Sequence, residues 1–177
     1  MQRITPAEGL QDLIGWMTGR GQILDFVRSL NGGGGWEQWA VIDFLRYQFP
    51  LRSQVQPLSY QRELRIPGLK RAFDIAYNLP SGADGPPTQQ YPLILTQWKC
   101  LNDGNAASMG AQTDIGTLGE AMQRIPLGYS WLPVLVILCP QPVGFPGVQS
   151  QGVPGTPVML HASSPATWQA YGISSGQ

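Results

Sequence analysis

The chain has 177 residues, of which 42% are apolar and 12% charged, and its formal net charge at pH 7 is zero. This length suits one domain with a sizeable core, and the low charge content excludes disorder driven by charge repulsion. Polyanion-binding proteins usually carry a basic excess, so neutrality argues modestly against nucleic acid, although a local arginine cluster is enough for phosphate contacts.

The sequence shows no targeting or membrane-spanning segment. Residues 1–6 lack the apolar run of a signal peptide. The longest apolar stretch, Trp131–Cys139, contains a proline and is too short to cross a bilayer. We therefore expect a cytoplasmic protein without membrane contact.

Cysteine and histidine are scarce. Cys100 and Cys139 are the only cysteines and His161 is the only histidine, which rules out a local Cys/His zinc cluster. The cysteines are either buried free thiols in a reducing compartment or a disulfide between adjacent strands. His161 has no serine or cysteine nucleophile motif near it, so a catalytic triad is not expected.

The first predicted element is a helix. Thr5 and Glu8 form a capping box with a proline at the first helical position, and apolar residues follow at helical spacing. Gly19 and Gly21 are expected to interrupt this helix, which then resumes over Ile23–Leu30.

A second helix is expected over Trp36–Phe49, after a glycine run at 32–35 that predicts a flexible link. The run lacks the Gly-Lys-Ser/Thr that a phosphate-binding loop needs. Glu37 lies one residue off the apolar stripe of this helix, and Pro50 is expected to end it. The stripe consists of Trp36, Trp39, Ala40, Phe44 and Tyr47.

Three strands are expected next. Leu58–Ile66 and Arg71–Leu79 form a hairpin around Pro67-Gly68, and Tyr91–Leu101 is the third strand. Sequential strands of this kind predict an antiparallel meander. A small, polar loop is expected at 102–111.

A helix and a strand complete the expected core. The helix is capped by Thr113 and ends near Pro126, and Trp131–Cys139 is a buried strand. The helix allows this last strand to return parallel to the third strand. Proline and glycine dominate the tail, which is expected to be irregular apart from a short strand at Val158–His161.

The predicted fold is therefore α/β, a single domain over 1–177 with a mixed central sheet flanked by helices. Its core, at 36–139, has the order helix, strand, strand, strand, helix, strand (αβββαβ). The segment 1–31 is a helical N-terminal extension, and 140–177 is a loop-rich C-terminal segment.

Lys99 is one of only two lysines, and it lies at the end of an apolar strand, where a charge must be paired, solvated or functional. Strand side chains repeat with a period of two, so Gln97 and Lys99 share one face. The preceding strand carries a single carboxylate, Asp74, in its middle. These residues form a candidate site for metal-dependent phosphodiester cleavage.

This element order and these residues resemble the PD-(D/E)xK nuclease superfamily, which has the restriction-endonuclease-like fold. The resemblance covers roughly Trp36–Cys139, with Glu37 on the first core helix, Asp74 on the second strand and Gln97-Trp98-Lys99 on the third. Most members have an acid where this chain has glutamine, and its Gln-x-Lys version looks like that of some members, including the end-cutting subunit of certain transposons. The family's proline before the first aspartate is replaced by Phe73.

The resemblance implies a metal-dependent DNA endonuclease that uses Mg²⁺ or Mn²⁺. Asp74 would be the principal metal ligand, joined by the Gln97 amide oxygen, by Glu37 and by the backbone carbonyl of Trp98, because Mg²⁺ prefers oxygen ligands. Lys99 could position or deprotonate the attacking water. Positioning and charge stabilisation are favoured, because a lysine acts as a base only when burial or cationic neighbours lower its pKa.

Four basic residues cluster in the first hairpin. They either grip DNA backbone phosphates or form a solvated hairpin tip. Many nucleases of this kind act as homodimers in which one unit cuts each strand. The four residues are Arg62, Arg65, Lys70 and Arg71.

Two other acids, Asp43 and Glu63, are rivals for the metal role. The alternative to an enzyme is a catalytically inactive nuclease fold that binds protein or nucleic acid, which zero net charge and the glutamine in the motif would favour. Side chains of Asp74, Gln97 and Lys99 that converge at one end of the sheet would favour the enzyme. An Asp74 on the opposite face from Lys99 would exclude it.

Overall fold

The computed structural model describes residues 1–30, 36–82, 84–100, 113–139, 157–163 and 169–175, without residues 115, 118, 122 and 127. The predicted flexible link and the polar loop after the third strand lie outside the described residues. The elements in chain order are α1 (Pro6–Leu30), α2 (Glu37–Arg52), β1 (Tyr60–Leu64), β2 (Phe73–Tyr77), β3 (Leu93–Cys100), β4 (Trp131–Cys139), β5 (Pro157–Ser163) and β6 (Gln169–Ser175).

α1 begins as the sequence predicts but is continuous. The Thr5 hydroxyl accepts the Glu8 N–H at 3.2 Å and the Glu8 carboxylate accepts the Thr5 N–H at 2.7 Å, which confirms the capping box. The predicted interruption is wrong, because α1 runs through Gly19 and Gly21. Each glycine costs about 1 kcal/mol in a helix, and full burial of Trp16 on the same helix offsets that cost.

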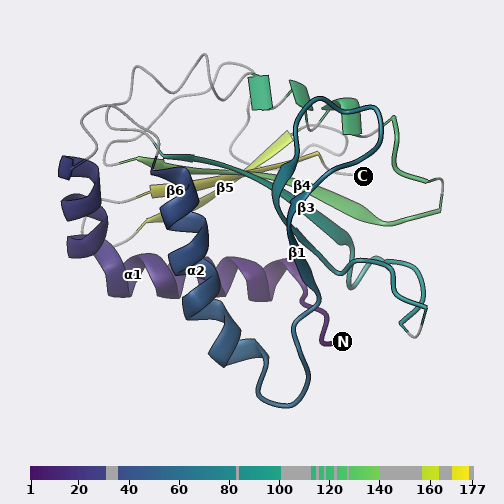
Figure 1. Ribbon diagram of the computed structural model, residues 1–177, viewed down its shortest axis with the longest axis horizontal. Coiled ribbons are helices and arrows are strands. Elements are labelled where there is room, and N and C mark those ends of the chain that lie inside the picture. Colours follow the sequence, from purple (N-terminus) through teal and green to yellow (C-terminus); the bar gives the residue numbers. More distant parts are fainter. Residues whose placement is uncertain are drawn as a thin grey trace.

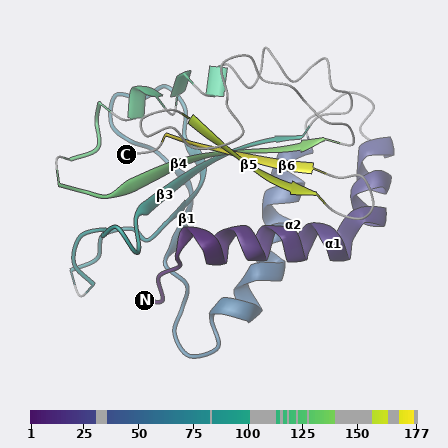
Figure 2. The ribbon, with the colours of Figure 1, turned by 180° about the vertical axis from the view of Figure 1, so that it is seen from behind.

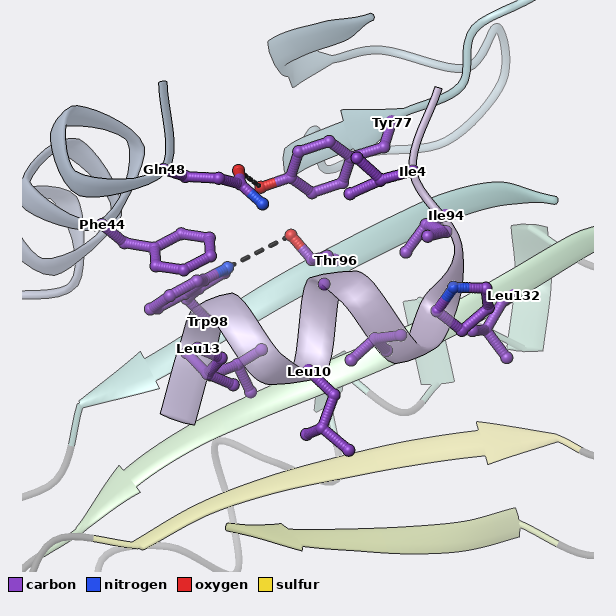
Figure 3. A pocket seen from close by; sticks show the side chains of 14 residues that line it. Ile4, Leu10, Leu13, Phe44, Gln48, Tyr77, Ile94, Thr96, Trp98 and Leu132 are labelled. Atoms are coloured by element: carbon purple, nitrogen blue, oxygen red, sulfur yellow. Dashed lines mark hydrogen bonds between the residues drawn. The ribbon is translucent and has the colours of Figure 1, made fainter. Parts of the chain in front are cut away.

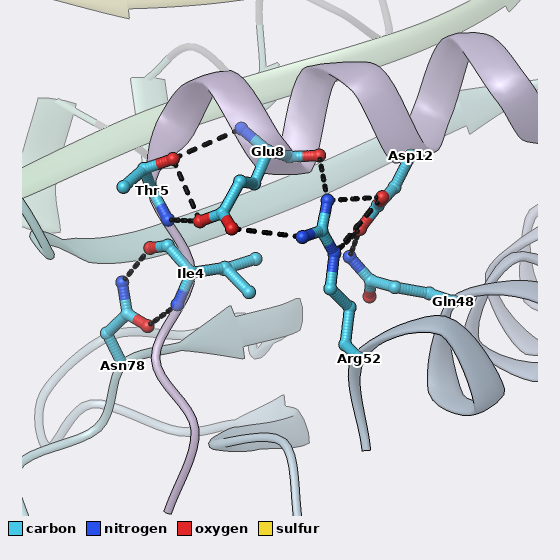
Figure 4. A network of polar contacts seen from close by, with 7 residues as sticks. All are labelled: Ile4, Thr5, Glu8, Asp12, Gln48, Arg52 and Asn78. Atoms are coloured by element: carbon cyan, nitrogen blue, oxygen red, sulfur yellow. Dashed lines mark hydrogen bonds and ion pairs between the residues drawn. The ribbon is translucent and has the colours of Figure 1, made fainter. Parts of the chain in front are cut away.

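α2 passes through Pro50 and ends at Arg52, so the prediction that Pro50 stops it is wrong. Proline there loses one backbone hydrogen bond, but contacts with α1 hold the last turn (Figure 4). Arg52 donates to Asp12 from Nε at 2.9 Å and from Nη2 at 2.7 Å, and to Glu8 from Nη1 at 3.0 Å. Gln48 donates to Asp12 at 2.8 Å. Glu8, Asp12, Gln48 and Arg52 are called the α1–α2 network below.

The strands form a six-stranded mixed sheet in the order β1-β2-β3-β4-β6-β5. β1, β2 and β3 are antiparallel neighbours and β3 and β4 are parallel, as predicted. The described residues between 113 and 121 are helical and lie on the β3–β4 crossover. The predicted α/β class and mixed sheet are confirmed.

β6 lies where the sequence predicts an irregular tail, and that expectation is wrong. The strand pairs with β4 on one side and with β5 on the other, both antiparallel. Its sequence, Gln-Ala-Tyr-Gly-Ile-Ser-Ser, is mostly small and polar and lacks a strand's usual apolar alternation. Backbone hydrogen bonds with two neighbouring strands therefore stabilise β6, and no local sequence pattern predicts this strand.

The sheet separates two layers (Figure 1). α1 and α2 lie on one side and the helical residues between 113 and 121 lie on the other, and the view from behind agrees (Figure 2). Along β3, Thr96 and Trp98 face the α1–α2 side, where they line a pocket with residues of both helices. Gln97 and Lys99 therefore face the opposite side.

The core between sheet and helices is aromatic. The ring centroid of Trp98 lies 6.0 Å from that of Trp16 and 5.3 Å from that of Phe44. Cys100, at the end of β3, is a buried free thiol, and burial raises its pKa well above the ordinary value. The predicted α2 stripe is confirmed, since its residues are buried or packed against this core: Trp36, Trp39, Ala40, Phe44 and Tyr47.

In the part of the chain that the structure describes, neither helix is both long and apolar enough to cross a membrane.

Candidate active site

Asp74 lies where β2 and β3 separate. The antiparallel register of these strands runs from Tyr77–Ile94 to Ile75–Thr96. One residue further, the Asp74 carboxylate accepts the backbone N–H of Trp98 at 2.7 Å. The N–H and C=O of one strand residue point to the same side. The Trp98 carbonyl is therefore directed toward β2 and the Asp74 end of the sheet.

Asp74 is a carboxylate that its surroundings leave short of positive charge. Burial raises its pKa above the ordinary value of 3.8, while the Trp98 N–H and the Lys99 ammonium lower it less strongly. The carboxylates of Asp114 and Glu37 add a smaller upward contribution. A cation placed beside Asp74 would offset this cost and favour the charged form.

Gln97 and Lys99 lie on the face of β3 that carries the site. Gln97 is 6% exposed, and its Nε2 donates to the Ala72 carbonyl at 2.8 Å. Its Oε1 is the acceptor atom of the side chain. Lys99 is 24% exposed and close enough to Asp74 to lower the pKa of that carboxyl. The structure therefore brings Asp74, Gln97 and Lys99 together.

Asp114 is a member of the site that sequence reasoning missed. It is 1% exposed, at the start of the helical residues that follow β3. Its Oδ1 accepts from Arg71 Nη1 at 3.0 Å, and its Oδ2 lies 3.3 Å from Lys99 Nζ. The Oδ2 contact is an ion pair without hydrogen-bond geometry. The available signal was an acid directly after the capping Thr113, on the crossover that returns beside β3.

Glu37 belongs to α2, on the side of the sheet opposite to the face that carries Gln97 and Lys99, and its charge acts on the same end of the sheet. It lies in the first turn of that helix and is half-buried. Its charge raises the pKa of both Asp74 and Cys100. Glu37 therefore contributes negative potential to the site.

The two rival acids lie elsewhere. Asp43 accepts the Trp16 indole N–H at 2.9 Å and pairs with Arg20 at 3.4 Å, which commits it to the contact between α1 and α2. Glu63 is 63% exposed on the edge strand β1 and pairs with Arg62 at 3.8 Å. Neither acid belongs to the group of Asp74, Gln97, Lys99, Asp114 and Glu37, which is called the Asp74 cluster below.

The hairpin between β1 and β2 carries four basic residues, of which Arg71 contacts the site. Arg65 and Lys70 are exposed, Arg62 is partly buried, and Arg71 is 53% exposed while it contacts Asp114. The structure adds a basic residue that the sequence analysis did not select. The Arg124 guanidinium packs against the turn of this hairpin, at Gly68.

The oxygen atoms at the site suit a hard divalent cation. Asp74, Gln97 and Trp98 offer a carboxylate oxygen, an amide oxygen and a backbone oxygen, and the Trp98 carbonyl points to the same side as Asp74. Within the described residues, no three Asp, Glu, His or Cys side chains gather closely enough to hold a metal alone. A cation here would therefore depend on amide and backbone oxygens and on water as well as on carboxylate.

An apolar pocket of about 70 Å³ lies on the other face of β3, between the sheet and the two helices (Figure 3). Its polar groups bond to one another. The Tyr77 hydroxyl donates to Gln48 Oε1 at 2.9 Å, and the Trp98 indole N–H donates to Thr96 Oγ1 at 3.2 Å. With these groups already paired, the pocket offers no reactive group, so the Asp74 cluster is the better candidate site.

Comparisons of the chain with protein-family models, with curated proteins and with solved structures gave no match.

Proposed function

We propose that the chain is a metal-dependent DNA endonuclease, with a restriction-endonuclease-like core that spans α2 to β4. The observation that carries the proposal is the convergence of Asp74 and Lys99, from adjacent strands, around the backbone of Trp98. The element order α2-β1-β2-β3-helix-β4 and the parallel return of β4 beside β3 support the fold assignment.

Mg²⁺ or Mn²⁺ would be held by Asp74 Oδ1, Gln97 Oε1 and the Trp98 carbonyl, with Glu37 acting directly or through water. When bound, such an ion activates water and neutralises charge on the phosphoryl oxygens. The raised pKa of Asp74 supports this role, because a carboxylate short of positive charge gains most from a cation.

Lys99 would orient the attacking water and stabilise the charge that grows on the phosphate. Its ammonium pairs with Asp114 Oδ2 at 3.3 Å, and its charge also acts on the Asp74 carboxylate. This surrounding supports charge stabilisation over proton removal. The exposed donors of Arg65, Lys70 and Arg71 would contact DNA backbone phosphates on the hairpin side.

The test is cleavage of a supercoiled plasmid with Mg²⁺ or Mn²⁺, using the wild type, Asp74→Ala and Lys99→Ala. Each substitution should slow cleavage by at least about 100-fold, since it removes a group that acts on the reacting phosphate. Glu120→Ala is the matched control, because Glu120 is an exposed acid on the same layer as Asp114. Cleavage that survives both substitutions unchanged would refute the site.

A second candidate is a catalytically inactive nuclease fold that binds nucleic acid. The ion pair between Lys99 and the buried Asp114 favours it, because a lysine with a structural partner needs no catalytic role. This candidate predicts no cleavage by the wild type, together with DNA binding that weakens when Arg65 and Lys70 become alanine. Fluorescence anisotropy with a labelled duplex measures that binding.

A further inference from the structure

Asp114 is the most deeply buried charged group near the site, and it faces two cations from different elements. Lys99 reaches it from the end of β3, and Arg71 reaches it from the chain just before β2. A buried carboxylate is costly unless it is paired. Because Asp114 is only 1% exposed, the fold requires these cations to stay beside it.

Each of the two cations can interact with further groups besides Asp114. Arg71 contributes one guanidinium nitrogen to Asp114, at 3.0 Å, and its side chain is 53% exposed, so a ligand in solvent can reach it. Lys99 lies 3.3 Å from Asp114 Oδ2 without a hydrogen bond and also acts on Asp74. One carboxylate therefore fixes the separation between a phosphate-binding group and the lysine of the site.

We propose that Asp114 is a positioning residue that aligns Lys99 and Arg71 as one unit for a single phosphodiester. This inference rests on the proposed nuclease function for its consequence, but the alignment itself is a property of the fold. Arg71 holds one phosphate oxygen through the guanidinium donors that do not contact Asp114. Lys99 is paired with the same carboxylate and is thereby held beside the phosphorus that the water attacks. Precise alignment of this kind contributes to rate through positioning.

The chain offers a direct readout, because it has only two lysines. Selective ¹³C-lysine labelling gives Cε–Hε signals from Lys99 and Lys70 alone, and the exposed Lys70 serves as an internal control. Asp114→Asn keeps the side-chain shape and removes the charge. The Lys99 signals should shift in this variant and the Lys70 signals should stay in place. Unmoved Lys99 signals would overturn the proposal.

A second variant protects the test against a folding defect, which far-UV circular dichroism would reveal in Asp114→Asn. Arg71→Gln changes an exposed residue, and Asp114 should then pair with Lys99 alone. The Lys99 signals should shift here too, by less. Lys99 signals identical to those of the wild type in this variant would contradict a shared unit.

Cleavage separates the proposal from the proposed function. If the wild type cuts plasmid, Arg71→Gln should raise KM, and Asp114→Asn should raise KM and also lower kcat, each by about 10-fold. A purely structural Asp114 would leave KM unchanged once the folded fraction is accounted for, and that result would overturn the proposal. If the wild type cuts no DNA while the Lys99 signals still shift in Asp114→Asn, the alignment would be supported and the nuclease refuted.

Discussion

The α1–α2 network and the Asp74 cluster use the same residue types to opposite effect. In the network, Arg52 satisfies Glu8 and Asp12 together, and hydrogen bonds to Thr5 lower the pKa of Glu8. In the cluster, burial raises the pKa of Asp74, and one backbone N–H and a shared lysine only partly offset it. The network ties two helices together, whereas the cluster leaves a carboxylate that an additional cation would stabilise.

The two regions respond to pH in opposite directions. Folding lowers the pKa of Glu8, so its contribution to stability is complete above the ordinary value of 4.5 and is lost as pH falls through the folded pKa. Folding raises the pKa of Asp74, so its ionisation opposes folding once pH rises above 3.8. At neutral pH the ionised Asp74 therefore lowers the stability of the fold, and the ionised Glu8 raises it.

The largest effect on stability is expected when Arg52, the cation of the α1–α2 network, is removed. Arg52→Ala leaves the Asp12 carboxylate, which is 5% exposed, without its ion-pair partner. The free energy of unfolding should fall by about 3 kcal/mol, measured by urea denaturation at pH 7. Arg46→Ala is the control, because Arg46 is exposed on the same helix, and its effect should stay within about 0.5 kcal/mol. Equal effects of the two substitutions would mean that the network does not hold α2.

A smaller effect of opposite sign is expected at the site. Asp74→Asn keeps an acceptor for the Trp98 N–H and removes the buried charge. The free energy of unfolding should rise by about 1 kcal/mol at pH 7, and plasmid cleavage should be lost. The gain should shrink as pH falls through the raised pKa of Asp74 and vanish below about 3.8, where the carboxyl is protonated in both states. A loss of stability at pH 7 would show that Asp74 is a structural group.

The smallest effect is the difference in stability between two glycine substitutions in α1, one of which lies at the apolar pocket beside the network. Gly9 lines this pocket, and a Cβ there would lie 3.7 Å from Ile4 Cδ1, an ordinary contact. Gly9→Ala and Gly19→Ala should both stabilise α1 by up to about 1 kcal/mol, because alanine favours helices. Gly9→Ala should gain about 0.5 kcal/mol more by filling space, since a Cβ at Gly19 has no neighbour within 4 Å. Thermal denaturation of both variants tests this, and equal gains would indicate that a methyl group at position 9 gains no packing in the pocket.

Local patterns account for what the sequence could predict. Thr5 and Glu8 are three residues apart, and strand periodicity alone puts Gln97 and Lys99 on one face. The order of strands and helix also predicted the parallel pairing of β3 with β4. These features depend on neighbours in the chain, which is why one sequence was enough.

The features that were missed depend on distant contacts. α1 continues through Gly19 because Trp16 and Met17, on the same helix, are fully buried. α2 continues past Pro50 because Arg52 contacts α1. β6 is held by two neighbouring strands, and Asp114 acquires its importance only from Lys99 and the hairpin. Secondary-structure propensity and residue spacing do not predict contacts with residues that are distant in the sequence.

The turn at Gly68 links two segments that are far apart in the sequence. Its φ of +85° suits glycine, and any Cβ at this position would also collide with the Arg124 guanidinium. A larger residue at 68 therefore requires both a strained backbone and a displaced Arg124 guanidinium. In variants selected from a library randomised at both positions, we expect glycine to dominate at 68 whatever residue stands at 124, because the backbone strain remains when the Arg124 side chain moves away.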